Sequence, residues 1–138
     1  MYIGVTGSRK GCTIEQLTKF VQLADAKFWP PSEFHHGDCV GVDATTAVAA
    51  RTMGYALVGH PPDNDKHRAF MENDADWPAR PYLERNKEIV CAVDMLYVLP
   101  DSHTETTRSG TWSTKRYAHK IGRAYTVIYP NGTTELGN

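Results

Sequence analysis

A short apolar run, Tyr2-Ile3-Gly4-Val5-Thr6, is followed directly by the loop Gly7-Ser8-Arg9-Lys10-Gly11. The run has the composition of a β-strand, and apolar residues at helical spacing follow the loop. A strand that breaks into a glycine loop and then a helix is the start of a βαβ unit. The helix is expected to begin at a capping box formed by Thr13 and Gln16 and to end at Trp29-Pro30-Pro31.

The same alternation continues along the chain. Further strands are predicted at 33–36, 55–58, 95–99 and 124–129, and further helices up to about Met53, at 81–93 and at 110–121. Residues 59–80 predict an irregular excursion with one helical turn, and 130–132 predict a turn into a short tail. This order predicts an α/β fold, a Rossmann-like parallel sheet of about five strands in the order 3-2-1-4-5 with helices on both faces.

Length and composition narrow the class of protein. A chain of 138 residues, 41% hydrophobic and 22% charged, fits one domain spanning residues 1–138. The net charge of −1 argues against a protein that coats nucleic acid, although a local basic groove stays open. Neither a membrane span nor a signal segment is expected, and Cys12, Cys39 and Cys91 show no close pairing. Together these features predict a cytoplasmic protein.

Ligands of such sheets bind beyond the carboxyl ends of the strands, near the point where the strand order reverses. Loops 7–11, 37–43 and 100–111 are expected at those ends. In the first loop, Gly7, Ser8 and Arg9 offer backbone amides, a hydroxyl and a guanidinium to an anion. A tight turn with an exposed arginine would have the same sequence, so this loop alone does not distinguish an anion-binding site from a turn.

The second and third loops add similar groups. Gly37 and Gly41 would let a ligand approach the backbone closely, with Asp38 between them. Asp43 would either bind a ribose hydroxyl or cap the following helix. In the third loop, Arg108-Ser109-Gly110-Thr111 combines a guanidinium with hydroxyls and an open glycine backbone, which suits a phosphate.

One further pair, Arg85-Asn86, falls early in the predicted helix at 81–93. It would lie either over the same cleft or on a solvated helix face, and spacing does not choose between the two. The predicted ligand-binding residues are therefore Gly7, Ser8, Arg9, Gly37, Asp38, Gly41, Asp43, Arg85, Asn86, Arg108, Ser109, Gly110 and Thr111.

Together these motifs resemble the SLOG superfamily, which includes DNA-processing protein A and the Lonely-guy phosphoribohydrolases. The resemblance is carried by Gly7-Ser8-Arg9, Gly37-Asp38-Cys39-Val40-Gly41-Val42-Asp43-Ala44, Arg85-Asn86-Lys87-Glu88-Ile89-Val90 and Ser109-Gly110-Thr111-Trp112-Ser113-Thr114, in order over residues 2–130. It implies a single small SLOG-like domain of bacterial or phage origin. It also implies that the ligand is a nucleotide or nucleotide derivative, bound by a sensor or carrier.

The hydrolase branch of that superfamily carries a glutamate after its glycine–threonine loop, where this chain has Ser113 and Thr114. The resemblance also suggests Arg85 as a candidate catalytic residue. Cleavage of an N-glycosidic bond needs a group that stabilises the cationic centre or activates water, commonly a carboxylate. Asp38, Asp43, Glu84 and Asp101 are the substitutes in this chain, and nothing in the sequence selects one of them.

Three functions are therefore retained, in decreasing order of support: a binder of a nucleotide-derived molecule, a nucleotide N-glycosidase or phosphoribohydrolase, and a single-strand nucleic-acid binder. Whether a reaction is catalysed stays open, as does a homo-oligomer.

No cofactor and no metal is expected. His60 and His67 flank Asp63 and Asp65, but solvated loops share this composition. Adjacent His35 and His36 would point to opposite faces of a strand. Cys39 is expected to be a small buried thiol rather than a nucleophile. Trp77, Tyr82 and Trp112 would pack or stack on a base, and Trp112 is the best placed of them for stacking.

Overall fold

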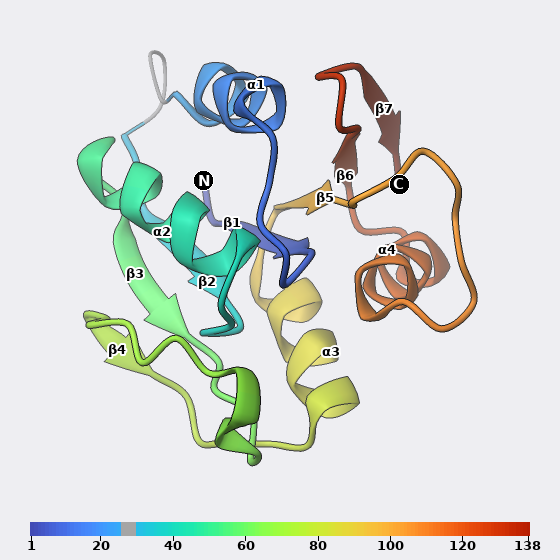
Figure 1. The fold of residues 1–138 in the computed structure, drawn as a ribbon. Helices are drawn as coiled ribbons and strands as arrows, with labels where there is room; N and C mark the ends of the chain where they lie inside the picture. Colours follow the sequence, from blue (N-terminus) through green and yellow to red (C-terminus); the bar gives the residue numbers. More distant parts are fainter. Residues whose placement is uncertain (26–29) are drawn as a thin grey trace.

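Seven strands form one sheet in the computed structural model, which describes residues 1–25 and 30–138. The strands are β1 (Ile3–Gly7), β2 (Glu33–His36), β3 (Ala56–Gly59), β4 (Ala75–Asp76), β5 (Met95–Leu99), β6 (Tyr125–Ile128) and β7 (Thr134–Gly137). Their order across the sheet is β4-β3-β2-β1-β5-β6-β7 (Figure 1). Neighbouring strands are parallel except for β7, which is antiparallel to β6.

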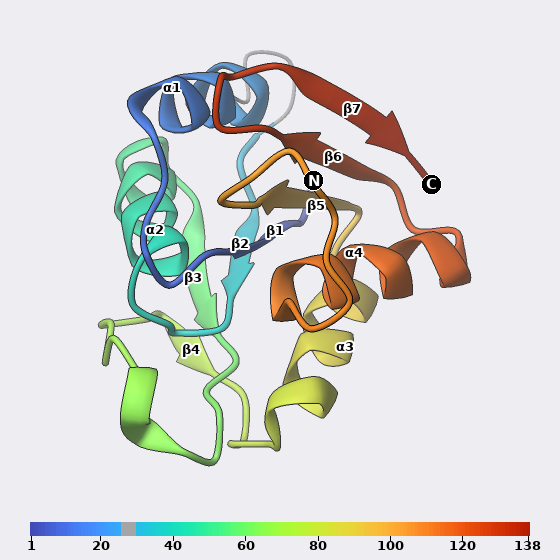
Figure 2. The ribbon, with the colours of Figure 1, turned by 45° about the vertical axis from the view of Figure 1, so that its right-hand side comes forward.

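The helices cover both faces of this sheet. They are α1 (Ile14–Ala24), α2 (Val42–Thr52), α3 (Tyr82–Ala92) and α4 (Gly110–Ile121), with one 3-10 turn, η1 (Asp65–His67). Figure 2 shows α1 and α2 on one face of the sheet and α3 and α4 on the other. The predicted α/β class with helices on both faces is therefore confirmed.

The central strand β5 explains why both faces need cover. Leu96 and Val98 belong to the apolar cluster of α3 and α4, whereas Tyr97 and Leu99 belong to the cluster of α1 and α2. Because side chains alternate along a strand, a strand that is apolar at every position must be buried on both sides. All four side chains are at most 5% exposed.

The predicted order 3-2-1-4-5 is confirmed as β3-β2-β1-β5-β6, but the strand count of about five is wrong. β4 and β7 add one strand at each edge. The two residues of β4 are exposed and polar or small, so they carry no apolar alternation. The expected tail after the turn at 130–132 returns as β7, whose first three residues are also exposed.

Helix α1 begins as predicted. The Thr13 hydroxyl accepts a hydrogen bond from the Gln16 amide, and the Gln16 side-chain oxygen accepts one from the Thr13 amide. The buried Gln16 also donates to the carbonyls of Pro100 and Ile128, which ties α1 to the ends of β5 and β6. The helix ends at Ala24, earlier than expected, and the expected terminator Trp29 lies outside the described residues.

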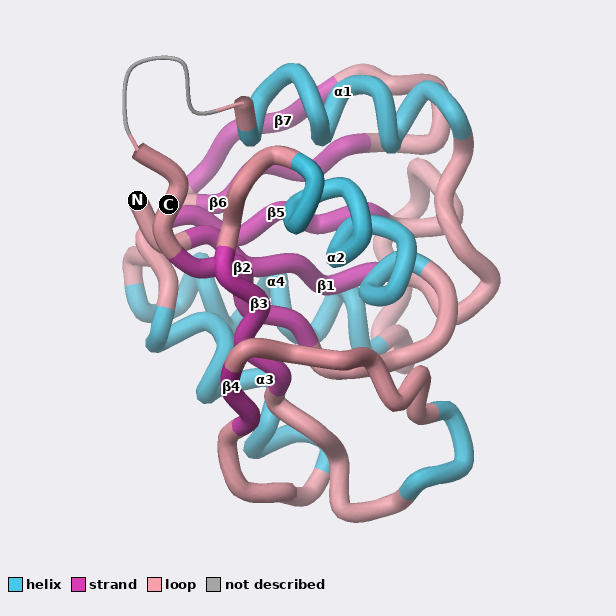
Figure 3. The backbone as a smooth tube through the Cα atoms, turned by 90° about the vertical axis from the view of Figure 1, so that its left-hand side faces the viewer, coloured by secondary structure: helices cyan, strands magenta, loops and turns pink. Residues whose placement is uncertain are grey.

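The excursion between β3 and α3 projects beyond the sheet edge (Figure 3) and contains the one helical turn that was predicted, η1. It also contains β4, which extends the sheet beside β3. In the described part of the chain, no helix is long and apolar enough to cross a membrane.

Candidate functional site

A cavity of about 620 Å³, here called the cleft, opens at the carboxyl edge of the sheet. Its walls come from the loops that follow β1, β3 and β5, with one residue after β2 and the first turn of α3. The volume lies in the range of sites for small organic ligands. Among the predicted binding residues, those that line the cleft are Gly7, Ser8, Arg9, Arg85, Arg108, Ser109, Gly110 and Thr111.

Strand order places two of the predicted loops together. Gly7 pairs with Leu99 at the ends of β1 and β5, and the Ser8 amide donates to the Leu99 carbonyl. The loops that follow these strands therefore start side by side. The chain crosses to opposite sides of the sheet at this pair of strands, which is the position where such folds open a binding crevice.

The loop at 37–43 was predicted to contact a ligand, but in the structure it contacts other parts of the protein. Gly37, Asp38, Gly41 and Asp43 do not line the cleft. A Cβ on Gly41 would lie 2.5 Å from the Ser8 carbonyl oxygen, and Gly41 has a φ of +91°. The glycine is therefore needed because two loops pack backbone to backbone, and not because a ligand approaches there.

The start of α2 is likewise occupied by the protein. The Val42 amide donates to the Ser8 carbonyl at 3.0 Å. Asp43 is buried, and its Oδ2 accepts the Gly37 amide at 2.8 Å, while Gly41 at the N-cap has no side-chain cap. Burial raises the pKa of Asp43, and this effect outweighs the positive charges of His36 and Arg85, which lower it. Asp43 therefore shapes the loop, and it neither lines the cleft nor occupies the N-cap position of α2.

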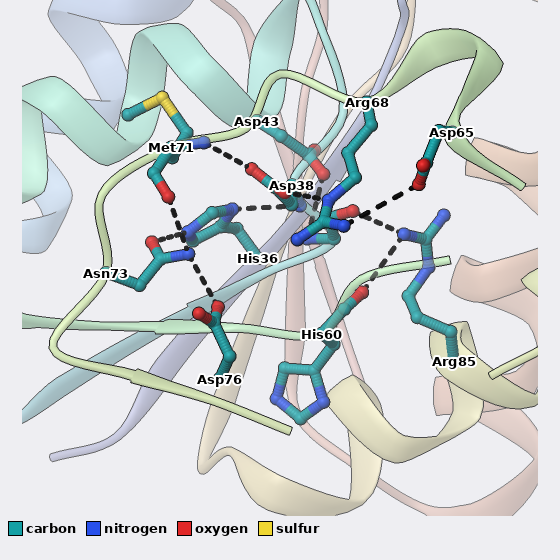
Figure 4. A network of polar contacts seen from close by, with 11 residues as sticks. His36, Asp38, Asp43, His60, Asp65, Arg68, Met71, Asn73, Asp76 and Arg85 are labelled. Atoms are coloured by element: carbon teal, nitrogen blue, oxygen red, sulfur yellow. Dashed lines mark hydrogen bonds and ion pairs between the residues drawn. The ribbon is translucent and has the colours of Figure 1, made fainter. Parts of the chain in front are cut away.

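Asp38 fastens the excursion to the end of β2, as Figure 4 shows. Its Oδ2 accepts Nε of Arg68 at 2.7 Å, and its Oδ1 accepts the Met71 amide at 2.8 Å. The Asp38 amide donates to Nδ1 of His36 at 3.0 Å, and Nε2 of His36 contacts Asn73. This network holds the segment that forms the outer wall of the cleft, so Asp38 acts on the cleft indirectly.

That outer wall was not predicted. Pro62, Asp63, Asn64, Lys66 and His67 all line the cleft, and Lys10 from the first loop joins them. The strand order could have predicted this wall, because the residues that follow β3 leave the same edge of the sheet as the predicted loops.

Arg85 is the most buried charged group in the cleft, at 4% exposed. Its Nε donates to Oδ1 of Asn86 at 2.8 Å, and Nη1 donates to the carbonyls of His60, at 3.2 Å, and Gly37. A Cβ on Gly37 would lie 2.5 Å from Nη1, so this glycine makes room for the guanidinium. Asn86, which does not line the cleft, orients Arg85.

No ion pair holds the guanidinium of Arg85 in the described part of the chain, although its charge and that of the buried Asp43 are close enough to interact. Among residues 1–25 and 30–138, no hydrogen bond occupies its Nη2. Its Cζ lies 4.9 Å from the centre of the Tyr82 ring. The remaining N–H groups therefore belong to the cleft, which Arg85 lines.

The start of α4 offers a second set of donors. Ser109 is the N-cap and accepts the Trp112 amide at 3.4 Å. The amides of Gly110 and Thr111 donate to no acceptor in the described part of the chain. Free amides at a helix N-terminus carry partial positive charge and favour an anion.

The electrostatic balance of the cleft differs from that of the whole chain. Basic residues lining it are Arg9, Lys10, Lys66, Arg85 and Arg108, against the carboxylates Asp63 and Asp101. Lys10 and Asp101 form an ion pair at 3.6 Å. The chain as a whole has a net charge of −1, so positive charge is concentrated at this edge.

The described residues do not form a reactive thiol or a metal site in the cleft. Burial, with the nearby Asp43, raises the pKa of Cys39 to about 11, which keeps the thiol protonated and unreactive. His35 contacts His60 at 2.7 Å while His36 contacts Asn73. No group of three or more metal-binding side chains occurs within residues 1–25 and 30–138.

Of the three aromatic candidates, only Tyr82 lines the cleft. Trp112 is 3% exposed and packs in the core of α3 and α4, which is the packing alternative of the two considered from the sequence. Trp77 lies against His60, with 4.4 Å between the ring centres.

Searches with protein-family models and against curated proteins found no match. Solved structures do match. The molybdenum cofactor binding protein of the phototrophic bacterium Rippkaea orientalis gives a TM-score of 0.67 at 20% identity, over 93% of this chain and 76% of that one. The structural-genomics target TM1055 gives 0.61 at 15% identity, over 90% and 71%.

DNA processing protein A from Helicobacter pylori, studied for its single-stranded DNA binding, gives a TM-score of 0.64 at 19% identity. The match covers 92% of this chain and 64% of that protein. This chain therefore shares its fold with these three proteins. The resemblance inferred from the motifs is confirmed at the level of the fold, and the cleft lies at the carboxyl edge of the shared sheet.

Most of the carboxylates considered from the sequence as hydrolytic groups do not line the cleft. Thr114 is buried and donates its hydroxyl to the Gly110 carbonyl at 2.7 Å. Asp38 and Asp43 are engaged elsewhere, and Glu84 does not line the cleft. Of the four substitutes considered from the sequence, Asp101 alone reaches the cleft, where it pairs with Lys10.

Proposed function

We propose that this protein binds a nucleotide or nucleotide-derived small molecule in the cleft and acts as a sensor or carrier rather than as a hydrolase. The phosphate lies against Arg85, with Ser8 and Arg9 on one side and the start of α4, Ser109–Thr111, on the other. The observation that carries the proposal is the buried guanidinium of Arg85, which lines the cleft with no carboxylate within ion-pair distance among residues 1–25 and 30–138.

Burying a charge is costly unless it is paired, and a buried arginine normally has an acidic partner. Here neutral carbonyls and Asn86 fix the guanidinium in place, and its Nη2 has no partner among residues 1–25 and 30–138. Arginine forms forked hydrogen bonds to phosphate, so an anionic ligand would supply an acceptor and a directly paired charge. The free amides of Gly110 and Thr111 favour the same kind of ligand.

Two alternatives have weaker support. A nucleotide N-glycosidase would need a carboxylate beside the sugar, and the two in the cleft are Asp63 and the ion-paired Asp101. Single-stranded DNA binding is the property named for the Helicobacter pylori protein. In this chain the basic groups line one cleft and the net charge is −1, which favours a small molecule.

Calorimetric titration with AMP, ADP and ADP-ribose tests the proposal. Arg85→Lys keeps the charge but loses the fork, and Arg85→Ala removes both. We expect Arg85→Ala to weaken binding by at least about tenfold, the scale of one charge-assisted contact. Lys87→Ala, a change on the exposed side of the same helix, is the control. Equal affinities in wild type and Arg85→Ala, both folded by circular dichroism, would contradict the proposal.

The same samples decide between a binder and an enzyme. Chromatography after prolonged incubation with AMP should show no free base. Release of base that disappears in Arg85→Ala would instead establish the N-glycosidase.

Light scattering on these samples measures the oligomeric state. The three free thiols fit the reducing cytoplasm, where we place the protein.

A further inference from the structure

The cations of the cleft come from separate parts of the chain. Lys10 is compensated by Asp101. The remaining four, Arg9, Lys66, Arg85 and Arg108, have no ion pair with any residue in 1–25 or 30–138. A single phosphate monoester carries a charge of only about −1.5 to −2. One phosphate therefore leaves much of this positive charge without a partner.

Three of these cations divide into two groups at two positions in the cleft. Arg9 and Arg85 line the cleft together with Cys39 at the end of β2, and the charge of each opposes the rise that burial causes in the pKa of the Cys39 thiol. Arg108 immediately precedes Ser109 and the free amides at the start of α4. Each group can hold one phosphate by itself.

Tyr82 lies between the two groups. Its ring faces the guanidinium of Arg85, with 4.9 Å from Cζ to the ring centre. Its hydroxyl lies 2.1 Å from the position that a Cβ on Gly110 would occupy. The length of one tyrosine ring thus connects the two anion positions, a separation that consecutive phosphates of one ligand can span.

We propose that the cleft selects a diphosphate over a monophosphate, as in a nucleoside diphosphate or a ligand whose two halves are joined by a diphosphate. One phosphate binds Arg9 and Arg85, and the other binds Arg108 and the amides of α4. This inference rests on the proposed function and goes further, since it specifies the class of ligand.

His67 provides an independent readout of charge in the cleft. Desolvation, followed by the positive charges of Arg9 and Lys66, lowers its pKa. A diphosphate bound beside Arg9 opposes those cations and raises the pKa of His67. A pH titration by NMR, with and without pyrophosphate, detects this change. We expect pyrophosphate to raise the pKa more than inorganic phosphate does.

Calorimetry at constant ionic strength compares phosphate with pyrophosphate and AMP with ADP and ADP-ribose. We expect wild type to bind ADP at least about tenfold more tightly than AMP, because the second phosphate adds one charge-assisted contact of about that strength. Arg108→Ala should keep most of the AMP affinity and reduce this preference to near one. Arg9→Ala should weaken both ligands. Lys120→Ala, an exposed basic change at the far end of α4, should change neither.

The outcomes separate the two proposals. AMP and ADP binding with equal affinity in wild type, with no effect of Arg108→Ala on their ratio, would overturn the diphosphate inference and leave the proposed function intact. Failure of every phosphate ligand to bind would overturn both. ADP-ribose binding more tightly than ADP indicates a bridging diphosphate, and the reverse indicates a terminal one; either result supports the inference.

Discussion

Nε of Arg68 lies 2.7 Å from Oδ2 of Asp38, and this ion pair joins the excursion between β3 and α3 to the end of β2. The carboxylate is 1% exposed and the arginine side chain 25% exposed. Asp38 has a φ of 54°, in the left-handed region that aspartate and asparagine enter more readily than most residues. The excursion carries the outer wall of the cleft, so the stability of this pair should affect both folding and ligand binding.

Asp38→Ala should lower the free energy of unfolding by about 2–4 kcal/mol, because it leaves Arg68 without its ion pair and the Met71 amide without its acceptor. It should also make residues 60–80 easier to cleave in limited proteolysis. Asp38→Asn keeps the backbone preference and one acceptor, so its loss should be smaller. Urea unfolding measures both changes. An Asp38→Ala protein as stable and as protease-resistant as wild type would show that the pair does not anchor the excursion.

Arg116 holds the loop that presents Arg108. Its Nη1 donates to Glu105 at 2.9 Å and to the Thr106 carbonyl at 3.3 Å, and Nη2 donates to the Thr107 carbonyl at 3.1 Å. We expect Arg116→Ala to increase amide exchange in residues 101–109 and to weaken ADP binding by roughly three- to tenfold. Its effect on global stability should stay within about 1 kcal/mol, since these contacts are exposed.

Lys120→Ala on the same helix is the control for charge removal. Unchanged exchange in Arg116→Ala would mean that the loop keeps its shape without this clamp.

The fold followed from the sequence because its signals are local. The apolar run at 95–99 requires cover on both faces, and the Thr13 capping box marks a helix start. β4 and β7 escaped prediction because both are exposed edge strands, defined by their neighbours rather than by their own pattern. The edge of the sheet that carries the cleft was also predictable from the strand order.

The candidate site was only partly predictable, since a sequence does not show which way a polar group faces. Asp38 and Asp43 have the composition of ligand contacts, yet both bind the protein's own backbone. The spacing of Arg85 allowed two interpretations, and only its burial at a position that lines the cleft distinguishes them. Lys66 lies in an irregular stretch where no local pattern indicates its position.

His60 should make stability depend on pH. Burial, then the charges of His35, His36 and Arg85, lowers its pKa to about 3 from 6.5. Between these values the unfolded chain binds a proton that the folded chain does not. Stability from this group is therefore complete above pH 6.5 and is lost as the pH falls towards 3, at up to about 1.4 kcal/mol per pH unit.

Glu88 does not prevent this loss. Its Oε2 lies 3.8 Å from Nδ1 of His60, too far for a hydrogen bond, and its other oxygen contacts Arg80. Urea unfolding at several values from pH 7.5 to 4 should show a shallower slope for His60→Gln than for wild type. His119→Gln, an exposed histidine on α4, is the control. Identical slopes for wild type and His60→Gln would exclude His60 as the source.

Gly110 should matter for the shape of the cleft more than for folding. It does not have a positive φ, so a side chain there causes no backbone strain. A Cβ would instead lie 2.1 Å from the Tyr82 hydroxyl, and Tyr82 is 49% exposed and free to swing outward. Gly110→Ala should therefore melt within a few degrees of wild type while losing most of its ADP affinity, because Tyr82 no longer lies between the two anion positions.

The two causes of that loss can be separated by a second change. Tyr82→Ala alone removes the ring without placing a methyl group at residue 110. If the methyl group acts by displacing Tyr82, Tyr82→Ala should lose as much ADP affinity as Gly110→Ala does, and we expect this result because the nearest atoms to a Cβ on Gly110 all belong to Tyr82. Full ADP affinity in Tyr82→Ala would instead assign the loss to the methyl group itself. A Gly110→Ala protein that unfolds without ligand would show that this glycine serves packing between α3 and α4.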